Sequence, residues 1–537
     1  MSIQAKIDAA PPGGTVAVAP GTYNEQLIID KPLTLTGPAS GEAIIDAGGM
    51  AAVPVIHILA NDVTVQRLTI RNGPLQGIRV GDAANPNLTG IVIKSNIIRG
   101  HGRAGIDTIN NASLLIEDNL IENNGLTTGT GRAGIFLFPH GNTIIRDNII
   151  RNNIFDGIFA RASSAGLTIS ANVISGHSLS GITLAWDEQN VSITNNHIED
   201  NGTGTFEEQG GIVIIQSVAE EISDNTIIDN RLSGIFWGWV ATSGPAPEIL
   251  ITGNVIQESS RDGIYLFSQG PGGFLPPDPY PLTPEITNNQ VLDNGRAGVY
   301  ISNLFFFSPG NANPEIHNND LVDNTWGVFN ATSGIVDATL NWWGANSGPF
   351  HSELNPQGTG DPVSDRVLFE PWLVRPPTAV LDCQLTAISL VDYQFAAETS
   401  GKTRVTTTIE LQGMLTLEYD TEVETQPFEH QFTKTFLLPG IPDTGQRELH
   451  LLSRGECVAE LEDGTVLVTA LLHLLFSVQT PVQLLVPSYG FCPVPAVCGE
   501  NNPAVQQAKL RAEAVYTDLI LARCRQADCV EFAVEPA

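Results

Sequence analysis

The sequence predicts an all-β protein whose larger part is a parallel β-helix, and three observations predict it. A phrase of Asn, an aliphatic pair and a polar turn recurs along the chain, often after 24 residues. Apolar and polar residues alternate inside each copy, which is the spacing of a strand. Gly followed by Ile or Val comes nine residues after the Asn at Asn148→Gly157, Asn172→Gly181, Asn225→Gly234, Asn254→Gly263 and Asn289→Gly298. Such self-similar units stack as the rungs of a solenoid.

The elements follow in a simple order. Three short strands a rung fill residues 1–375, because no helical pattern intervenes. Composition shifts at residues 375–377, where the repeated phrase stops. Residues 376–537 are predicted to be a smaller, cysteine-containing and mostly-β domain, with strands over 403–419 and 465–486 and a helix over 503–523.

The asparagines are predicted to be structural. Asn tolerates a left-handed backbone, and its amide bonds to neighbouring groups in a turn. One column begins with Asn72 and Asn96, and amides stacked ~4.8 Å apart would bond one another along the axis. A second column lies five residues on, at Asn124, Asn153, Asn201, Asn230, Asn294 and Asn324. Both columns predict ladders rather than catalytic groups.

Residues 1–375 resemble the right-handed parallel β-helix, or pectin-lyase-like, superfamily. Residues 3–16 and 20–25 are similar to its usual entry, which implies an N-terminal capping helix followed by the first strands. Asn341-Trp342-Trp343-Gly344 with Glu370-Pro371-Trp372 is similar to its usual exit. The resemblance implies the fold and leaves activity open, since one fold hosts many functions. Residues 482–495 resemble a segment of uncharacterised, spore-coat-like proteins of Firmicutes.

Whole-chain numbers exclude some partners. A formal net charge of −32 disfavours nucleic acid and anionic membranes. No run of about 18 apolar residues predicts membrane insertion, and no leader is seen, so we expect cytoplasmic synthesis with a final place at a spore or cell surface. All six cysteines follow the β-helix, as disulfides or as thiols. No metal or cofactor is expected, although acidic turns leave calcium open.

One face of the predicted solenoid is unusually aromatic. The outward positions two residues after each Gly are Asp107, Phe136, Phe159, Thr183, Val213, Phe236, Tyr265, Tyr300 and Phe329. A long exposed apolar patch marks an interface or a ligand groove. We therefore expect a polysaccharide, the second domain or another copy of the chain to bind there. The predicted ligand-binding residues are Phe136, Phe159, Phe236, Tyr265, Tyr300, Trp186 and Trp239.

Polar candidates for catalysis lie in the trough that long turns would form over this face. They are His140, Arg161, Asp187, Glu188 and Glu207, with Glu208 beside the last. Paired carboxyls suit glycoside hydrolysis, and a base with a carboxylate clamp suits a lyase. The plainer interpretation is that Asp187-Glu188 is a solvated turn and Glu207-Glu208 a loop tip. Gly100-His101-Gly102 and Phe138-Pro139-His140 lack the acids that accompany such motifs in polygalacturonases and alginate epimerases.

The leading hypothesis is therefore a non-catalytic structural or surface-coat β-helix protein, which self-associates or contacts polysaccharide through its aromatic outer sheet. The first alternative is a polysaccharide lyase or glycoside hydrolase that acts in the trough. The second is a carbohydrate-binding protein. Regular rungs and the lack of an assembled acid–base set favour the leading hypothesis.

Overall fold

The computed structural model divides the chain into two compact units, Met1–Val374 and Arg375–Ala537, and each is described by itself. The structure describes residues 2–109, 112–127, 131–162, 165–186, 188–202, 209–238, 249–268, 283–303, 312–375, 379–397, 402–419, 422–439, 448–462, 465–479 and 528–534.

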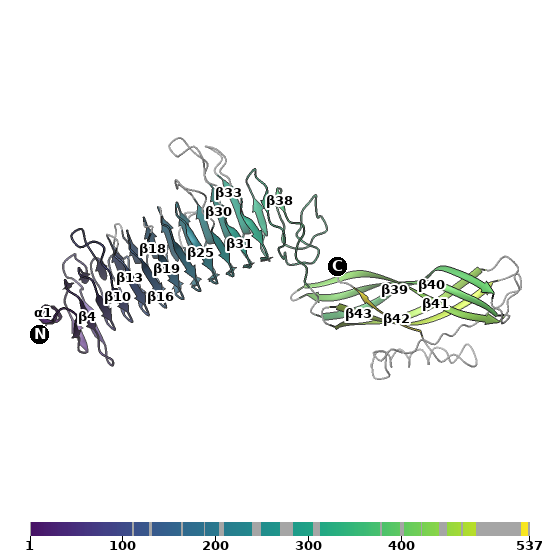
Figure 1. Cartoon of the computed structure of the whole chain (residues 1–537), viewed down its shortest axis with the longest axis horizontal. Helices are drawn as coiled ribbons and strands as arrows, with labels where there is room; N and C mark the ends of the chain where they lie inside the picture. Colours follow the sequence, from purple (N-terminus) through teal and green to yellow (C-terminus); the bar gives the residue numbers. More distant parts are fainter. Residues whose placement is uncertain are drawn as a thin grey trace. The chain divides into compact units, whose positions relative to one another are not determined.

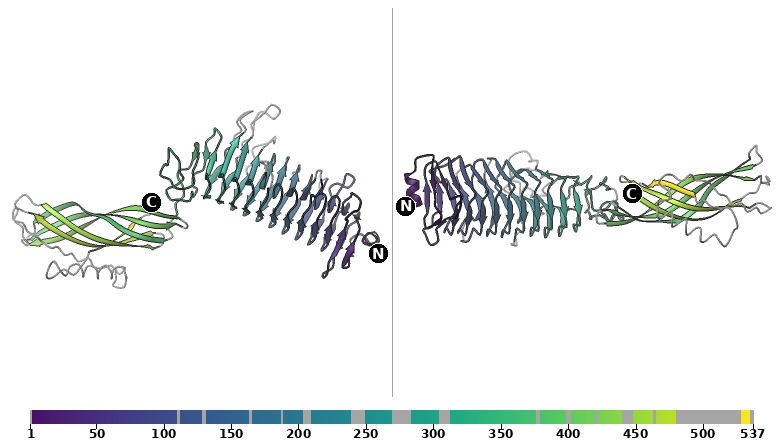
Figure 2. Two further views of the ribbon diagram at one scale, coloured as in Figure 1. Left: turned by 180° about the vertical axis from the view of Figure 1, so that it is seen from behind. Right: turned by 90° about the horizontal axis from the view of Figure 1, so that it is seen from below.

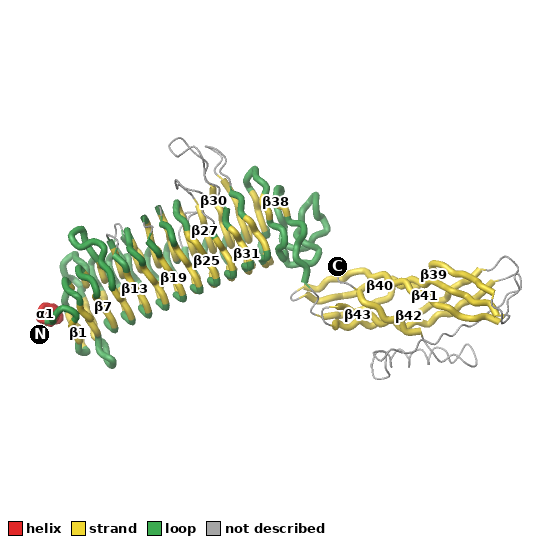
Figure 3. The backbone as a smooth tube through the Cα atoms, in the orientation of Figure 1, coloured by secondary structure: helices red, strands yellow, loops and turns green. Residues whose placement is uncertain are grey.

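The first unit is a parallel β-helix of three sheets, as predicted. Successive strands pass from sheet A to sheet B to sheet C and then begin the next rung (Figure 1). Short turns separate them, drawn green between yellow strands in Figure 3. Every pairing between consecutive rungs is parallel, and most keep an unbroken register; the β22–β25 pair contains a shift.

Sheet A contains β1 Gly14–Ala17, β4 Leu33–Thr36, β7 Val63–Gln66, β10 Ile91–Lys94, β13 Leu114–Glu117, β16 Thr143–Arg146, β19 Leu167–Ser170, β22 Val191–Thr194, β25 Ala219–Ser223, β28 Leu250–Thr252, β31 Glu285–Thr287, β34 Glu315–His317, β37 Val336–Asp337 and β38 Val367–Leu368. Sheet B contains β2 Gly21–Tyr23, β5 Ala43–Asp46, β8 Thr69–Arg71, β11 Ile97–Arg99, β14 Leu120–Glu122, β17 Ile149–Arg151, β20 Val173–Ser175, β23 His197–Glu199, β26 Thr226–Ile228, β29 Val255–Gln257, β32 Gln290–Leu292 and β35 Asp320–Val322. Sheet C contains β3 Leu27–Ile29, β6 Ile56–Ile58, β9 Ile78–Val80, β12 Ile106–Thr108, β15 Ala133–Leu137, β18 Asp156–Arg161, β21 Ile182–Ala185, β24 Gly210–Ile215, β27 Ser233–Gly238, β30 Asp262–Ser268, β33 Ala297–Asn303 and β36 Val328–Asn330.

Inward side chains form one continuous apolar core along the β-helix. In sheet A, Ile145 pairs in register with Ile169, and Ile169 with Ile193. All three are completely buried, and like residues from sheets B and C join them. The recurring glycine is needed because space is short: a Cβ on Gly157 would lie 2.6 Å from the carbonyl oxygen of Gly181.

A short helix caps the N-terminal end of the stack, as the sequence predicts (purple in Figure 2). This helix, α1, spans Ile3–Ala9. Ile3 and Ile7 are buried in the core, while the Glu25 carboxylate accepts hydrogen bonds from the first amides of the helix. The helix therefore covers apolar surface that the first rung would otherwise leave exposed.

The asparagine ladders are confirmed, with one correction. In the first ladder the Asn172 amide Nδ2 donates to Asn196 Oδ1 at 3.0 Å and to the carbonyl of Ile145 at 2.9 Å. The same bonding runs from Asn96 to Asn341. Asn72 was wrongly placed in this column: it is exposed with a φ of 58° and bonds Asp46 instead.

Two histidines and Ser259 occupy the positions of the second ladder that the asparagine spacing leaves open. The backbone N–H of Asn153 donates to His177 Nδ1 at 3.1 Å, and His177 Nε2 bonds the Ile150 carbonyl at 3.1 Å. His101 makes the equivalent bonds. Each ring thus accepts on one nitrogen and donates from the other, as an asparagine amide does. This arrangement requires neutral histidine, and burial lowers both pKa values to about 4.

The second unit consists of antiparallel sheets, as predicted for a mostly-β domain. One contains β39 Ala379–Ala397, β40 Lys402–Tyr419 and β41 Glu422–Pro439, and the other contains β42 Glu448–Glu462, β43 Thr465–Gln479 and β44 Asp528–Val534. They share a buried apolar core, and a Cys383–Cys457 disulfide joins β39 to β42. The predicted helix over 503–523 lies outside the described residues. None of the described helices is long and apolar enough to cross a membrane.

The neutral ladder histidines predict a specific pH dependence. With a pKa of about 4 in the folded chain and ~6.5 in the unfolded chain, His177 binds protons preferentially in the unfolded state between these values. It therefore lowers the free energy of unfolding as the pH falls through that window. We expect the free energy of unfolding of His177→Asn, measured relative to wild type by urea unfolding, to be about 2 kcal/mol higher at about pH 5 than at about pH 7.5. His197→Asn, at a partly exposed site, is the control, and a pH-independent difference for His177→Asn would contradict the ladder role.

Candidate functional site

The outward row of sheet C is in register, as the sequence spacing predicts. Asp107 pairs with Phe136, and Phe136 pairs with Phe159. The row continues through Thr183, Val213, Phe236, Tyr265, Tyr300 and Phe329. One rung before Asp107 it contains Arg79 and, before that, His57. The row therefore runs from charged side chains to aromatic ones along a single face.

The middle of this row is buried, which corrects the prediction of continuous exposure. Phe236 is 2% exposed and Tyr265 is 5% exposed. They form a separate apolar cluster with Val213 outside the main core. Phe236 and Tyr265 pack edge to face with their ring centroids 5.1 Å apart. In this structure these two predicted ligand-binding residues offer little surface to a ligand.

The aromatic platform lies before this buried stretch and consists of Phe136, Phe138, Phe159 and Trp186 with Arg161. Phe136 and Phe159 are stacked, with centroids 5.2 Å apart and planes 5° apart. Trp186 lies 6.0 Å from Phe159. The Arg161 guanidinium lies 3.6 Å from the Phe138 centroid and 5.1 Å from that of Trp186. The strands β15, β18 and β21 therefore bring four predicted site residues together.

Trp186 is exposed although its backbone is unfavourable for tryptophan. Its side chain is 48% exposed and its φ is 53°. The stacked turn positions Ala162 and Gln216 have the same left-handed conformation. This conformation costs roughly 1–2 kcal/mol for a residue other than glycine, asparagine or aspartate. Strain on a large exposed ring is a reason to look for function at that position.

Arg161 contacts rings rather than acids. Within the described part of the chain no carboxylate lies within ion-pair distance of it, and its buried Nε has no hydrogen-bond partner. Partial burial lowers the pKa of its guanidinium. A cation held over rings by cation–π attraction keeps its N–H groups available for a ligand.

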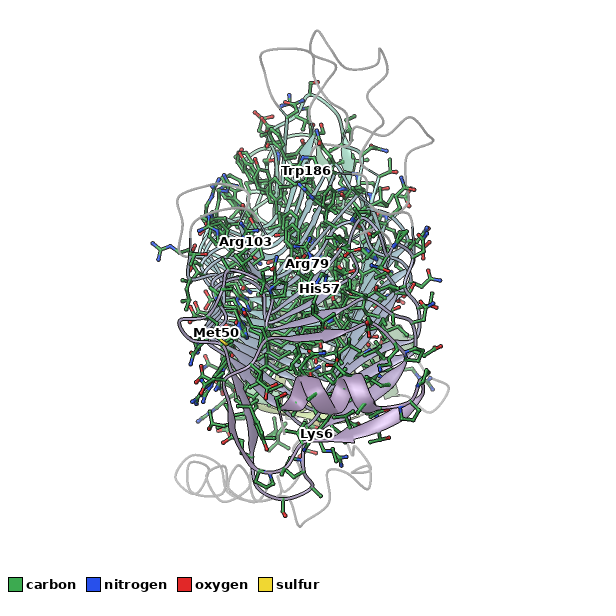
Figure 4. All side chains as sticks on the ribbon, turned by 90° about the vertical axis from the view of Figure 1, so that its left-hand side faces the viewer. Lys6, Met50, His57, Arg79, Arg103 and Trp186 are labelled. Carbon is green, nitrogen blue, oxygen red and sulfur yellow. A yellow bond between two sulfur atoms is a disulfide. The ribbon has the colours of Figure 1, made fainter. Side chains whose placement is uncertain are left out.

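A charged cluster adjoins the platform on its N-terminal side and consists of Gln76, Arg79, Arg103 and Asp107. Figure 4 labels both arginines with His57 and Trp186. Gln76 Nε2 donates to Asp107 Oδ2 at 2.9 Å, and Arg79 Nε is 3.8 Å from the same oxygen. Burial raises the pKa of Asp107 to about 6, against the lowering effects of Arg79, Gln76 and Arg103. Asp107 thus titrates near neutral pH.

Asp156 is a second perturbed acid on the same side of sheet C. It is buried, and the Thr183 hydroxyl donates to its Oδ1 at 2.7 Å. Burial raises its pKa to about 7, although the Thr183 and Ser180 hydrogen bonds lower it. From rung and residue spacings its backbone is roughly 14 Å from that of Asp107. Glycosidase carboxyls are typically about 5–9.5 Å apart, so these two are not assembled as such a pair.

His140 and Glu188 are also brought together, in a different place. His140 Nε2 lies 2.9 Å from Glu188 Oε1, and both side chains are completely buried. The Ser217 hydroxyl accepts from the Glu188 amide. The pair ties three turns together, so Glu188 is not in the solvated turn of the plainer interpretation. In this structure neither side chain reaches a surface where a substrate would bind.

Other predicted residues cannot be placed. Asp187, Glu207, Glu208 and Trp239 lie outside the described residues.

Tyr300 lies beyond the buried stretch, stacked on Phe329 with centroids 5.5 Å apart. Arg296 covers the Tyr300 ring at 3.4 Å and pairs with the buried Asp262. This second aromatic group is therefore tied into an internal ion pair.

Sequence reasoning missed Gln76, Arg79, Arg103 and Asp156 as site residues. A signal for Asp156 was present: it directly precedes the phrase glycine, where neighbouring rungs have Ala133 or Ser180. A carboxyl in a column of small residues indicates a special role. The other three precede the first fully regular copies of the phrase, where alignment by spacing is weakest.

A shallow depression of about 460 Å³ lies elsewhere, on the outer face of sheet A. Val92, Leu115 and Ile144 line it, with glycines and small polar residues around them. Its lining contains no titratable side chain, so it supplies no acid–base chemistry.

The fold and the rows of sheet C define a right-handed parallel β-helix protein. A family model described as a right handed beta helix region matches residues 54–244. A second, described as periplasmic copper-binding protein (NosD), matches residues 205–350. Nothing in these matches supports the spore-coat resemblance. A search of the curated proteins found no match.

Solved structures with the same fold are distant in sequence. They include the Dettilon tailspike protein (13% identity, 88% of this chain and 84% of that chain, TM-score 0.39). Another is the A-module of the Azotobacter vinelandii mannuronan C-5 epimerase AlgE6 (16% identity, 69% of this chain and 94% of that chain, TM-score 0.31). A third is the catalytic unit of a Streptomyces thermodiastaticus GH87 alpha-1,3-glucanase (17% identity, 69% of this chain and 65% of that chain, TM-score 0.41). Likeness at this level concerns the fold and carries no argument about function.

The residues do not fit a copper site. The stretch that matches the copper-binding model contains His317 as its one histidine, and no cysteine or methionine. Copper sites in proteins use imidazole and sulfur ligands. Among the described residues, no group of three or more His, Cys, Asp or Glu side chains is placed to hold a metal ion.

Asp156 allows a test of the electrostatics of this face. A folded-state pKa of about 7, above ~3.8 in the unfolded chain, means that the folded chain binds more protons in this window. Stability is therefore lost as the pH rises from about 4 to about 7. Asp156→Asn removes the buried charge. Its free energy of unfolding relative to wild type should therefore be up to about 4 kcal/mol higher at about pH 8 than at about pH 4. Urea unfolding measures this, with the exposed Asp30→Asn as control; a difference that does not grow with pH would refute the assignment.

Proposed function

We propose that this protein binds a polysaccharide along the outer face of sheet C, with the aromatic platform as its central contact. The observation that supports this most directly is the parallel Phe136–Phe159 stack with the exposed Trp186 beside it. The exposed ring of Trp186 suits the apolar face of a sugar, and the Phe136–Phe159 stack beside it supplies a rigid apolar surface. The rows lie along the axis, so the platform is extended in the direction that a linear polymer requires.

Charge near the platform supports a polar, oxygen-rich ligand. Arg79, Arg103, Arg132 and Arg161 lie on neighbouring rungs, although the whole chain has a net charge of −32. Arg132 lies 3.4 Å over the Phe155 ring, and Arg161 is similarly placed over Phe138. Guanidinium groups held on rings present hydrogen-bond donors without a competing acid. A sugar offers acceptor oxygens to such donors.

Binding without catalysis is the function we favour. The two perturbed acids of sheet C, Asp107 and Asp156, have backbones roughly 14 Å apart and are not assembled as a glycosidase pair, and His140 with Glu188 is buried. A role at a cell surface or in self-association belongs to the same proposal, since a bound polymer would organise several copies. A processing enzyme is the second candidate, favoured by Asp107, whose pKa of about 6 suits acid–base work.

Trp186→Asn separates function from folding at the platform. Asn adopts the left-handed conformation readily, so the variant should be as stable as wild type or about 1 kcal/mol more stable. Polysaccharide affinity should fall at least about tenfold, because the exposed ring is lost. Affinity electrophoresis in gels containing dextran, β-1,3-glucan, polygalacturonate or alginate measures binding, and thermal unfolding measures stability.

The matched control is Leu340→Asn. Leu340 is also an exposed apolar residue with a positive φ, of 58°, but it follows β37 in sheet A. The Leu340→Asn variant should be stabilised by the same relief of backbone strain, and it should bind polysaccharide as the wild type does. Wild-type migration that none of the polymers retards would refute polysaccharide binding, and an unchanged Trp186→Asn variant would exclude the platform as the contact.

A further inference from the structure

The charged cluster of Gln76, Arg79, Arg103 and Asp107 is continuous with the aromatic platform. Arg79, Asp107 and Phe136 occupy the same row on three successive rungs. Gln76 and Arg103 come from the turns before β9 and β12. A ligand that covers the Phe136 ring along this row would therefore meet the cluster on the next rung, ~4.8 Å away.

The acid in this cluster is held by an amide rather than by an arginine. Gln76 is 2% exposed and Asp107 4% exposed, and the bond between them fixes the carboxylate. Arg79 stays at 3.8 Å, and Arg103 acts on Asp107 only through its charge. Two acids on the other sheets differ: Arg146 holds Glu117 at 2.7 Å, and Arg151 holds Glu122 at 2.8 Å.

Both hydrogen-bond donors and a hydrogen-bond acceptor are left without partners in this cluster. Gln76 Oε1, an acceptor, is buried and has no partner. Arg79 Nε and Arg103 Nε, which are donors, are likewise buried without partners. Each buried polar group left in this state costs roughly 1–3 kcal/mol. The ion pairs of Glu117 and Glu122 on sheets A and B, by contrast, leave no buried atom of those side chains without a partner.

The unused groups define the chemistry of a ligand. A simple anion accepts from the arginines but faces Asp107 and leaves Gln76 Oε1 unsatisfied. A simple cation meets two guanidinium groups. Hydroxyl groups both donate and accept, so a pair of neighbouring hydroxyls satisfies donors and acceptors together. The partly exposed guanidinium of Arg79 provides the approach from solvent.

We propose that Gln76, Arg79, Arg103 and Asp107 form a hydrogen-bonding subsite for vicinal hydroxyl groups of the sugar unit next to the one that lies on Phe136. This inference rests on the proposed polysaccharide binding and adds the recognition of a diol to it. Asp107 and Gln76 accept from the hydroxyls, and the arginines donate to their oxygens. Neutral sugars and uronates share the diol, and a uronate carboxylate would interact with the arginines in addition.

The test uses the full-length chain in the same four polymer gels. Asp107→Asn keeps the shape of the side chain but removes a charged acceptor, so affinity for the polymer that binds should fall about tenfold or more. Arg103→Gln, at a half-buried arginine, is a second variant that should fall similarly even if Asp107→Asn folds poorly. Asp46→Asn is the matched control, because Asp46 forms a closed 2.8 Å ion pair with Arg71 on sheet B.

The outcomes separate the two proposals. If Asp107→Asn and Arg103→Gln bind as wild type does while Trp186→Asn does not, the subsite is wrong and the platform stands. If no polymer retards the wild type, polysaccharide binding and the subsite are both wrong. Loss of binding in both subsite variants, with Asp46→Asn unaffected, supports the diol subsite. Retardation by dextran or β-1,3-glucan identifies neutral sugars, whereas salt-sensitive retardation by polygalacturonate or alginate identifies uronates.

Discussion

The register between successive rungs is the constraint on which the rest of this structure depends. Asparagine amides bond both the next amide in the ladder and the backbone carbonyl of a neighbouring rung. A slip of one residue would break these bonds and turn the inward isoleucines to solvent. It would also place a Cβ where only the glycines of the repeated phrase fit. Three separate penalties therefore enforce one alignment.

Because the register is enforced, side chains at one phase of the repeat form rows. Neighbours in a row are ~4.8 Å apart, which suits aromatic stacking and alternating charges but penalises like charges. One row on sheet A places an acid between two bases, with Glu117 beside Lys94 and Arg146. These charges satisfy one another. The row on sheet C instead changes from charged to aromatic and leaves donors, acceptors and a strained tryptophan unused.

This contrast is the physical basis for assigning function to sheet C. Stability alone favours closed ion pairs and left-handed turns made of Asn or Gly, and most of this solenoid follows that rule. Sheet C carries several departures: Trp186 is both strained and exposed, and Gln76, Arg79 and Arg103 keep unpaired atoms. Functional sites commonly carry such local cost.

Sequence patterns predicted the rows correctly but not the depth at which each member lies. Phe136 and Phe159 are stacked as their spacing indicates, whereas Phe236 and Tyr265 in the same row are buried. Glu188 reads as a turn residue, yet it is buried against His140, 48 residues away in the chain. Both errors concern contacts between segments whose separation varies with turn length. Periodicity contains no information about them.

The sequence by itself determined the fold, the ladders and the outward row, because each depends on a repeat that is visible within one or two rungs. His101 and His177 could be understood as ladder members only in the structure, since their role depends on which neighbours each ring nitrogen meets. The same holds for the raised pKa values of Asp107 and Asp156, which come from burial. Burial is a property of all the chain that surrounds a residue, so tertiary structure alone decided it.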